Sequence, residues 1–151
     1  MVQQVVLDKT DEKILNELLA NAKTPLREMA RRVGTSFVTV MNRIKKMERQ
    51  GVIQKYTCRV DYERLGYDVH ILVEMRIAKG RLIELERKIA RSPNVLAVYD
   101  TTGDYDAVIL ARFKSTRAMD SFIKEIQTYD FVERTNTKLI LNTIKEDALR
   151  L

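Results

Sequence analysis

The chain has 151 residues and carries 27 Lys and Arg against 21 Asp and Glu, a formal net charge of +6. This length allows one ordinary domain or two small ones, and the hydrophobic fraction of 45% is enough for packed cores. No apolar run approaches the ~20 residues that a membrane-spanning helix needs, so we expect no membrane partner. The first residues lack the basic region and cleavage site of a secretory signal, and we therefore expect a cytoplasmic protein.

The chain contains one cysteine, Cys58, and one histidine, His70. A lone cysteine excludes an internal disulfide and argues against a thiolate metal cluster. His70 has no cysteine or acidic cluster near it in the sequence, so we interpret it as a strand surface residue rather than a ligand. We therefore expect no metal and no cofactor.

The positive charge is concentrated in one part of the chain. Residues 23–55 contain nine Lys and Arg against two Asp and Glu, whereas residues 67–151 contain 14 against 13. A basic island in a nearly neutral chain indicates a local surface for a polyanion. A solvated basic surface without a partner is the alternative, and the charge count alone leaves it open.

Three helices are predicted at the start of the chain. Residues 8–22 form the first, because apolar side chains recur at helical spacing behind a capping aspartate. The second has Thr24 as its expected cap, Pro25 in its first turn and Gly34 at its end. A third helix follows after a short turn, so the three are expected to pack as one unit.

The third predicted helix runs from a cap at Ser36 to about Gln50. Val40, Ile44 and Met47 are spaced by four and three residues and therefore share one face. The opposite face carries Val38, Asn42, Lys45 and Arg49, with Thr39 and Lys46 on its flank, whereas Arg43 lies nearer the boundary with the apolar face. Three helices with a tight glycine-containing turn before the third are the signature of a helix-turn-helix.

The third helix is the candidate reader of double-stranded DNA, since a recognition helix places its N-terminal residues against base edges in the major groove. Asn42 has the groups for a bidentate contact with adenine, while Lys46 and Arg49 reach guanine or phosphate. Arginines of the second helix are expected to hold phosphates. The predicted DNA-binding residues are Ser36, Val38, Thr39, Asn42, Arg43, Lys45, Lys46, Arg49, Arg27, Arg31 and Arg32. The alternative is that this helical face carries polar residues only because it is exposed to solvent.

The next segments predict how the first domain ends. Residues 52–60 have the pattern of a short strand or wing, which makes residues 1–60 a winged-type helix-turn-helix domain. Residues 61–67 are polar and contain Gly66, so we expect a linker there.

Residues 68–151 are expected to form a second domain. Its predicted elements are a strand, a helix, two strands, a helix and a strand, at 69–77, 82–89, 95–101, 105–113, 115–126 and 132–144. This βαββαβ order is ferredoxin-like, with one antiparallel sheet and two helices on one face, so the fold class is α+β. Leu72 and Leu110 fall among polar positions, which indicates that the second sheet face packs against another subunit.

The Thr-Thr-Gly-Asp-Tyr-Asp segment at 101–106 is the second candidate site. Gly103 permits a backbone conformation closed to other residues, and free N–H groups around such a turn bind a carboxylate. Asp104 and Asp106 are suited to an ammonium group, so the turn matches both ends of an amino acid. An ordinary hairpin turn with solvated aspartates is the simpler interpretation of these residues alone. No histidine or nucleophile is expected beside the two aspartates and no phosphate-binding glycine loop occurs, so we expect no enzymatic activity.

Several segments in this order carry a resemblance: 7–15, 25–30, 36–53, Tyr56 followed by 65–66, and 103–106. They are similar to segments of the Lrp/AsnC (feast/famine) transcription regulators, and the similarity covers nearly the whole chain. The resemblance implies a dimer that assembles into an octamer or another multimer, with the C-terminal sheets paired. It also implies an amino-acid effector bound between dimers. The effector-binding residues implied are Tyr99, Thr101, Thr102, Gly103, Asp104, Tyr105, Asp106, Thr135 and Thr137.

We therefore expect a sequence-specific transcription regulator in which an effector changes the assembly, and with it the spacing of the reading helices. Two alternatives remain open. One is an architectural protein that compacts DNA without sequence preference, and the other is a metabolite-binding regulatory subunit of an enzyme.

Overall fold

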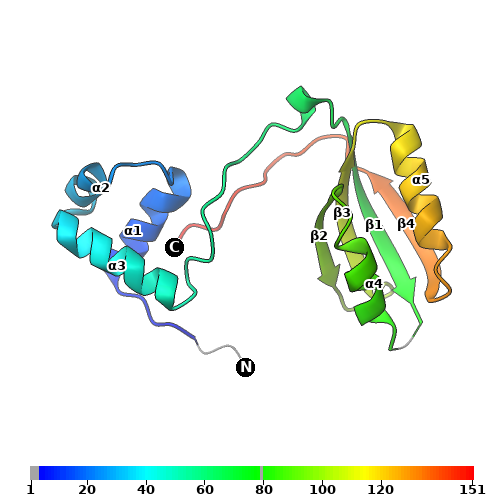
Figure 1. Cartoon of the computed structure of the whole chain (residues 1–151), viewed down its shortest axis with the longest axis horizontal. Coiled ribbons are helices and arrows are strands. Elements are labelled where there is room, and N and C mark those ends of the chain that lie inside the picture. The colour runs from blue at the N-terminus through cyan, green and yellow to red at the C-terminus, as the bar shows by residue number, and fades with distance from the viewer. Residues whose placement is uncertain (1–3, 79) are drawn as a thin grey trace. The chain divides into compact units, whose positions relative to one another are not determined.

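The computed structural model describes residues 4–78 and 80–151 (Figure 1). The chain divides into two compact units, one of Met1–Arg59 with Lys145–Leu151 and the other of Val60–Ile144. Within the described residues, no helix has both the length and the apolar character to cross a membrane.

The first unit contains the three predicted helices, α1 (Lys9–Ala20), α2 (Leu26–Val33) and α3 (Phe37–Arg49). Asp8 caps α1 and Ser36 caps α3, as predicted. The predicted cap of α2 is wrong, because Pro25 occupies the N-cap position and no side chain bonds to the helix there. Buried apolar side chains from all three helices form the core: Ile14, Leu15, Met29, Ala30, Val33, Val40, Ile44 and Met47.

The strand predicted over residues 52–60 is not formed, and the segment pairs with no strand of the described chain. The N–H groups of Val52 and Ile53 instead donate to the carbonyl of Met47, at 2.9 and 3.2 Å, and both side chains pack on the helical core. The C-terminal residues also join this unit. Asn16 holds the backbone of Leu151 with two hydrogen bonds, of 2.6 and 3.0 Å.

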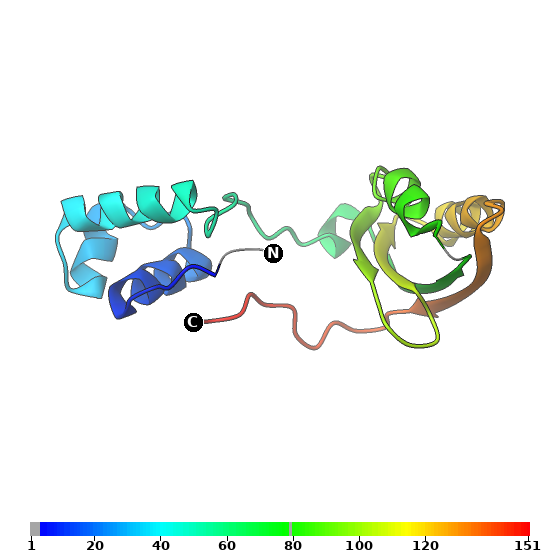
Figure 2. The same ribbon diagram turned by 90° about the horizontal axis from the view of Figure 1, so that it is seen from below.

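The second unit confirms the predicted ferredoxin-like order. After a short 3-10 helix, η1 (Glu63–Leu65), its elements are β1 (Val69–Ile77), α4 (Leu82–Ile89), β2 (Val95–Asp100), β3 (Ala107–Phe113), α5 (Thr116–Gln127) and β4 (Val132–Leu139). The strands form one antiparallel sheet in the order β2-β3-β1-β4. Figure 2 shows α4 and α5 over one face of this sheet.

Alternation along β1 and β3 separates the two sheet faces. Ile71, Val73 and Ile109 point toward the helices and are buried in the core. Leu72 and Leu110, which face each other across the two strands, lie on the other face and are only partly buried. Apolar side chains therefore lie on both faces of the sheet, as the positions of these two leucines in the sequence indicated, and the packing of this second face against another subunit stays a prediction.

Two details differ from the expectation. The last strand ends at Leu139 rather than at residue 144. Leu139 pairs with Ile71 near the start of β1, and one further hydrogen bond, from the Ile140 N–H to the His70 carbonyl at 2.8 Å, follows it. His70 is buried, with 8% of its surface exposed, rather than a surface residue. It lies in β1, a central strand of the sheet with β3 on one side and β4 on the other.

Candidate nucleic-acid interface and effector turn

The turn between α2 and α3 is short because Gly34 ends α2 in the left-handed conformation, with a φ of 80°. The N–H groups of Gly34 and Thr35 both donate to the carbonyl of Ala30, at 3.0 and 2.9 Å. Glycine adopts this backbone at little cost, so α3 begins almost directly after α2. The helix-turn-helix geometry therefore rests on this one residue type at this position.

Ser36 and Thr39 are both engaged in capping α3. The Ser36 hydroxyl accepts a hydrogen bond from the Thr39 N–H at 3.0 Å, and the two hydroxyl oxygens lie 2.8 Å apart. Such a cap satisfies one of the free N–H groups at a helix start. Both residues were predicted to contact DNA, and their first role in the structure is to fix where the helix begins.

The outer side of α3 presents most of the predicted reader residues to solvent. Val40, Ile44 and Met47 are buried and turn the opposite side outward. Exposed on that side are Val38, Asn42, Lys45, Lys46 and Arg49, and Thr39 is partly exposed. The structure therefore brings these six residues together on one continuous surface.

Three basic side chains of α3, Lys45, Lys46 and Arg49, form no ion pair with any residue that the structure describes. The same holds for Arg27 and Arg31, which are exposed on α2. Cations without a carboxylate partner are available to a polyanion at no cost in lost ion pairs. These two helices therefore provide the groups that phosphate contact requires.

Arg32 differs from its neighbours, because its guanidinium is already paired. It binds Glu17 of α1 at 3.0 Å and also Glu28, one turn earlier in α2. The hydrogen bonds with Glu17 and Glu28 raise the pKa of Arg32. Arg32 was predicted to hold a phosphate. In the structure it links α1 to α2.

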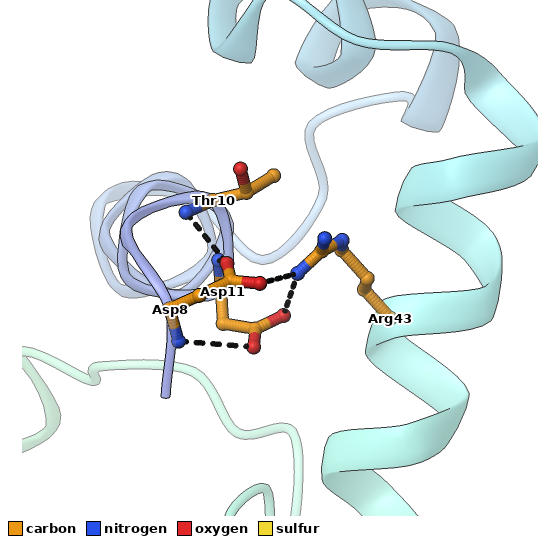
Figure 3. A network of polar contacts seen from close by, with 4 residues as sticks. All are labelled: Asp8, Thr10, Asp11 and Arg43. Atoms are coloured by element: carbon orange, nitrogen blue, oxygen red, sulfur yellow. Dashed lines mark hydrogen bonds and ion pairs between the residues drawn. The ribbon is translucent and has the colours of Figure 1, made fainter. Parts of the chain in front are cut away.

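Arg43 departs furthest from the expectation. Its Nη1 lies 2.6 Å from Asp8 Oδ2 and 2.8 Å from Asp11 Oδ1, so it bridges α3 to the start of α1 (Figure 3). Hydrogen bonds with Asp8 and Asp11 raise the pKa of Arg43, and the bond from Arg43 is the main cause that lowers the pKa of Asp8 to about 2. Asp8 and Asp11 are the partners that sequence reasoning missed. The available signal was the position of Arg43 beside the apolar face of its helix.

A groove of about 470 Å³ lies on the flank of the helix-turn-helix and was not predicted. Its lining residues are Leu18, Ala22, Thr24, Pro25, Leu26, Met41, Ile44, Lys45, Glu48 and Tyr56. The Tyr56 hydroxyl donates to Glu48 at 2.7 Å, and burial together with this carboxylate raises the pKa of Tyr56 to about 12. Since the lining comes from four separate segments, no spacing in the sequence marks the groove.

In the second unit, residues 101–106 form a compact turn between β2 and β3. The Thr101 N–H donates to the Asp106 carbonyl at 2.9 Å, and the Thr101 hydroxyl donates to the Tyr105 carbonyl at 3.0 Å. Gly103 has a φ of 115° at the exposed tip. The N–H groups of residues 102–105 have no partner within the described chain, so they remain available to an acceptor.

The two aspartates of the turn have different surroundings. Asp104 is exposed, and its carboxylate has no ion-pair partner in the described part of the chain. Asp106 is partly buried, and its Oδ2 accepts a hydrogen bond from the Ile77 N–H at 2.8 Å. An exposed aspartate beside free N–H groups can bind an ammonium and a carboxylate together. Asp104 is therefore the carboxylate that is accessible to a ligand, whereas Asp106 supports the turn.

The structure does not bring all the predicted effector residues together within one chain. Tyr99 pairs with Val108 on the sheet face away from the helices, and it is half exposed. Thr135 and Thr137 lie opposite Met75 and Val73, on the helix-covered face, and the Thr135 hydroxyl accepts a hydrogen bond from Gln127 of α5 at 2.9 Å. The sheet therefore separates these threonines from Tyr99.

Both units match known families. Residues 7–48 match the model of the AsnC-type helix-turn-helix domain, and residues 70–149 match that of the Lrp/AsnC ligand binding domain. An uncharacterized HTH-type transcriptional regulator of Pyrococcus abyssi is 39% identical over 142 residues, which cover 94% of this chain and 97% of that protein.

Solved structures show the same architecture. E. coli AsnC is 28% identical, with a TM-score of 0.90 over 97% of this chain and 100% of that chain. A transcriptional regulator of Neisseria meningitidis, solved as a complex with L-methionine, is 25% identical, with a TM-score of 0.91 over 97% of this chain and 96% of that chain.

Proposed function

This chain belongs to the Lrp/AsnC family of transcription regulators, and from that premise we propose that α3 reads a specific operator in double-stranded DNA. The family consists of regulators rather than enzymes. The observation that carries the proposal is the outer side of α3, where Asn42 is exposed among cations that have no carboxylate partner in the described chain.

In the proposed complex, α3 lies in the major groove. Asn42 forms a bidentate contact with adenine, while Lys46 and Arg49 bind guanine edges or phosphates. Thr39 and Val38 meet base edges at the helix start, where a recognition helix comes closest to the bases. Lys45, Arg27 and Arg31 hold phosphates and fix the register of the helix without reading sequence.

The proposed assembly is a dimer, and beyond it a multimer of dimers such as an octamer. The partly buried apolar positions Leu72 and Leu110 on the open sheet face support pairing of two sheets. A dimer presents two α3 helices, so its operator has two half-sites about 34–36 Å apart or a multiple of that distance. In this division of labour, residues 1–60 bind DNA, residues 61–67 connect the domains, and residues 68–144 carry the effector and the oligomer contacts, while residues 145–151 pack with the DNA-binding unit.

We also propose that an amino acid regulates this assembly through the turn at 101–106. The exposed N–H groups near Gly103 bind its carboxylate and Asp104 binds its ammonium group. The L-methionine complex of the Neisseria meningitidis regulator supports this class of ligand. The effector changes DNA binding only through a different affinity for two assemblies. Because the bacterial and archaeal relatives keep their DNA in the cytoplasm, we place the protein there as well.

Selection of preferred sequences from random duplex DNA tests the function. We expect a sequence with two-fold symmetry, bound less tightly as salt rises. The same selection with L-methionine, and then with a pool of amino acids, tests the effector by a change in affinity or in assembly mass. Binding that depends on salt without any preferred sequence would identify a DNA-compacting protein. No DNA binding at all would favour a regulatory subunit.

A further inference from the structure

Arg43 lies in the proposed recognition helix, but its guanidinium is bound inside the domain. One nitrogen, Nη1, contacts the carboxylates of both Asp8 and Asp11, at 2.6 and 2.8 Å (Figure 3). These two ion pairs join α3 to the first residues of α1. The guanidinium is thereby committed to two charges of its own chain.

The two aspartates are themselves fixed by the helix start. Asp8 Oδ1 accepts hydrogen bonds from the N–H groups of Thr10 and Asp11, at 2.8 and 3.0 Å. Asp11 Oδ2 accepts one from the Asp8 N–H at 3.3 Å, which completes a capping box. Because backbone groups hold both carboxylates, they form a rigid anchor for any side chain that binds them.

Burial makes the contact between Asp11 and Arg43 the stronger constraint. The side chain of Asp11 is 3% exposed, against 57% for Asp8 and 30% for Arg43. A buried carboxylate without a cation is strongly unfavourable, so Arg43 cannot leave Asp11 without a large loss. A phosphate that captured Arg43 would have to compensate for this loss.

We propose that Arg43 is a positioning residue: it fixes the direction of α3 on α1 through Asp8 and Asp11 and does not itself bind DNA. This inference rests on the proposed function, since it assigns a role within the same DNA-reading surface. Base contacts need a helix orientation that is correct to a small fraction of a groove width. The ion-pair link at Arg43 supplies such a constraint in addition to the apolar packing of the two helices.

A substitution that neutralises one carboxylate gives the sharpest test, because a DNA-binding role and a positioning role of Arg43 predict opposite changes in operator affinity. Asp11→Asn removes a negative charge and releases Arg43, so a DNA-binding Arg43 would strengthen operator binding. Positioning predicts the reverse, a loss of about fivefold or more, since even one misaligned base contact costs that much. Affinity for a random duplex of equal length stays the same or rises slightly.

A double-mutant cycle separates the two roles further. If Arg43 acts through Asp11, then Arg43→Gln combined with Asp11→Asn loses no more operator affinity than either variant alone. Arg49→Ala is the matched control, a neighbouring arginine proposed to meet DNA. It lowers the salt dependence of binding by about 0.9 in slope, whereas Arg43→Gln leaves the slope unchanged. Additive losses, or a lower slope for Arg43→Gln, would overturn the proposal.

A measurement without DNA keeps the inference independent of the operator. Residual dipolar couplings report the angle between α1 and α3, and we expect it to change in Arg43→Gln and Asp11→Asn but not in Arg49→Ala. Asp8→Asn retains a good capping residue and gives a folded variant if Asp11→Asn unfolds. An unchanged angle would refute the positioning role. A changed angle in a protein without operator preference would refute the proposed function alone.

Discussion

The carboxylate of Asp106 accepts a hydrogen bond from the backbone N–H of Ile77, with 2.8 Å between Oδ2 and nitrogen. Strand β1 continues to Ile77, but its partner β3 begins only at Ala107, opposite Met75. On the β3 side, the side chain of Asp106 therefore takes the place of a strand partner for Ile77, which pairs with Val132 of β4 on its other side. The Asp106 N–H also donates to the Met75 carbonyl at 2.9 Å, which anchors the turn to the sheet.

This contact predicts that Asp106→Ala destabilises the protein. The Ile77 residue is buried, and an N–H that loses its partner there costs about 1–3 kcal/mol. Urea unfolding followed by circular dichroism measures the loss in the second unit. A variant as stable as the wild type would show that this hydrogen bond does not contribute to the free energy of unfolding.

Asp104→Ala, by contrast, is expected to leave stability nearly unchanged and to weaken effector binding. Asp104 is exposed and supports no contact in the described chain, so the free energy of unfolding changes by less than about 0.5 kcal/mol. Binding of the amino acid weakens by about tenfold or more, because hydrogen bonds to charged groups contribute about 1.5–3 kcal/mol. Calorimetric titration with L-methionine, and then with other amino acids, measures this. Equal affinity of the variant and the wild type would remove Asp104 from the site.

Gly103→Ala tests the turn geometry itself. The φ of 115° is unfavourable for alanine, whereas an added Cβ would meet no atom within 4 Å. Any loss of stability therefore comes from backbone strain, and we expect about 1–3 kcal/mol. Thermal unfolding measures it. Gly80→Ala is a suitable control for strain, since Gly80 has a positive φ in another loop of the same unit.

Acid sensitivity follows from Asp8, whose pKa is lowered from 3.8 to about 2, chiefly by the hydrogen bond from Arg43. A carboxylate whose pKa is lower in the folded state stabilises the fold above its unfolded pKa. That contribution is lost as the pH falls from about 4 to about 2. We expect the melting temperature of Asp8→Asn to depend less on pH across this window than that of the wild type. Because Asp8 is exposed, added salt should reduce the difference, and parallel curves in low salt would contradict the assignment.

Local sequence signals were sufficient to predict most of the helices and strands. The cap at Ser36 correctly predicted the start of α3, and the alternation from Val69 to Ile77, interrupted at Leu72, correctly predicted β1, because caps and periodicity act within a few residues. The segment 52–60 failed as a strand because strand formation also needs a partner. No local pattern shows that the N–H groups at its start bond back to Met47.

The candidate sites were less predictable because their contacts are distant in sequence. Arg43 and Asp11 are separated by 32 residues, so helical phase placed Arg43 near the apolar face without revealing the carboxylates. Thr135 and Thr137 depend on the register of β4, and a single sequence does not decide which sheet face they occupy. Asn42, by contrast, was placed correctly on the exposed side of α3, since helix periodicity alone determines it.

The reading of bases by α3 is tested by the affinity of the wild-type protein for its selected operator and for a scrambled duplex of equal length and composition, at one salt concentration. A sequence-specific regulator binds the operator about 10³-fold or more tightly, and Asn42→Ala reduces that ratio with little effect on the scrambled duplex. Equal affinity for the two duplexes would contradict the account.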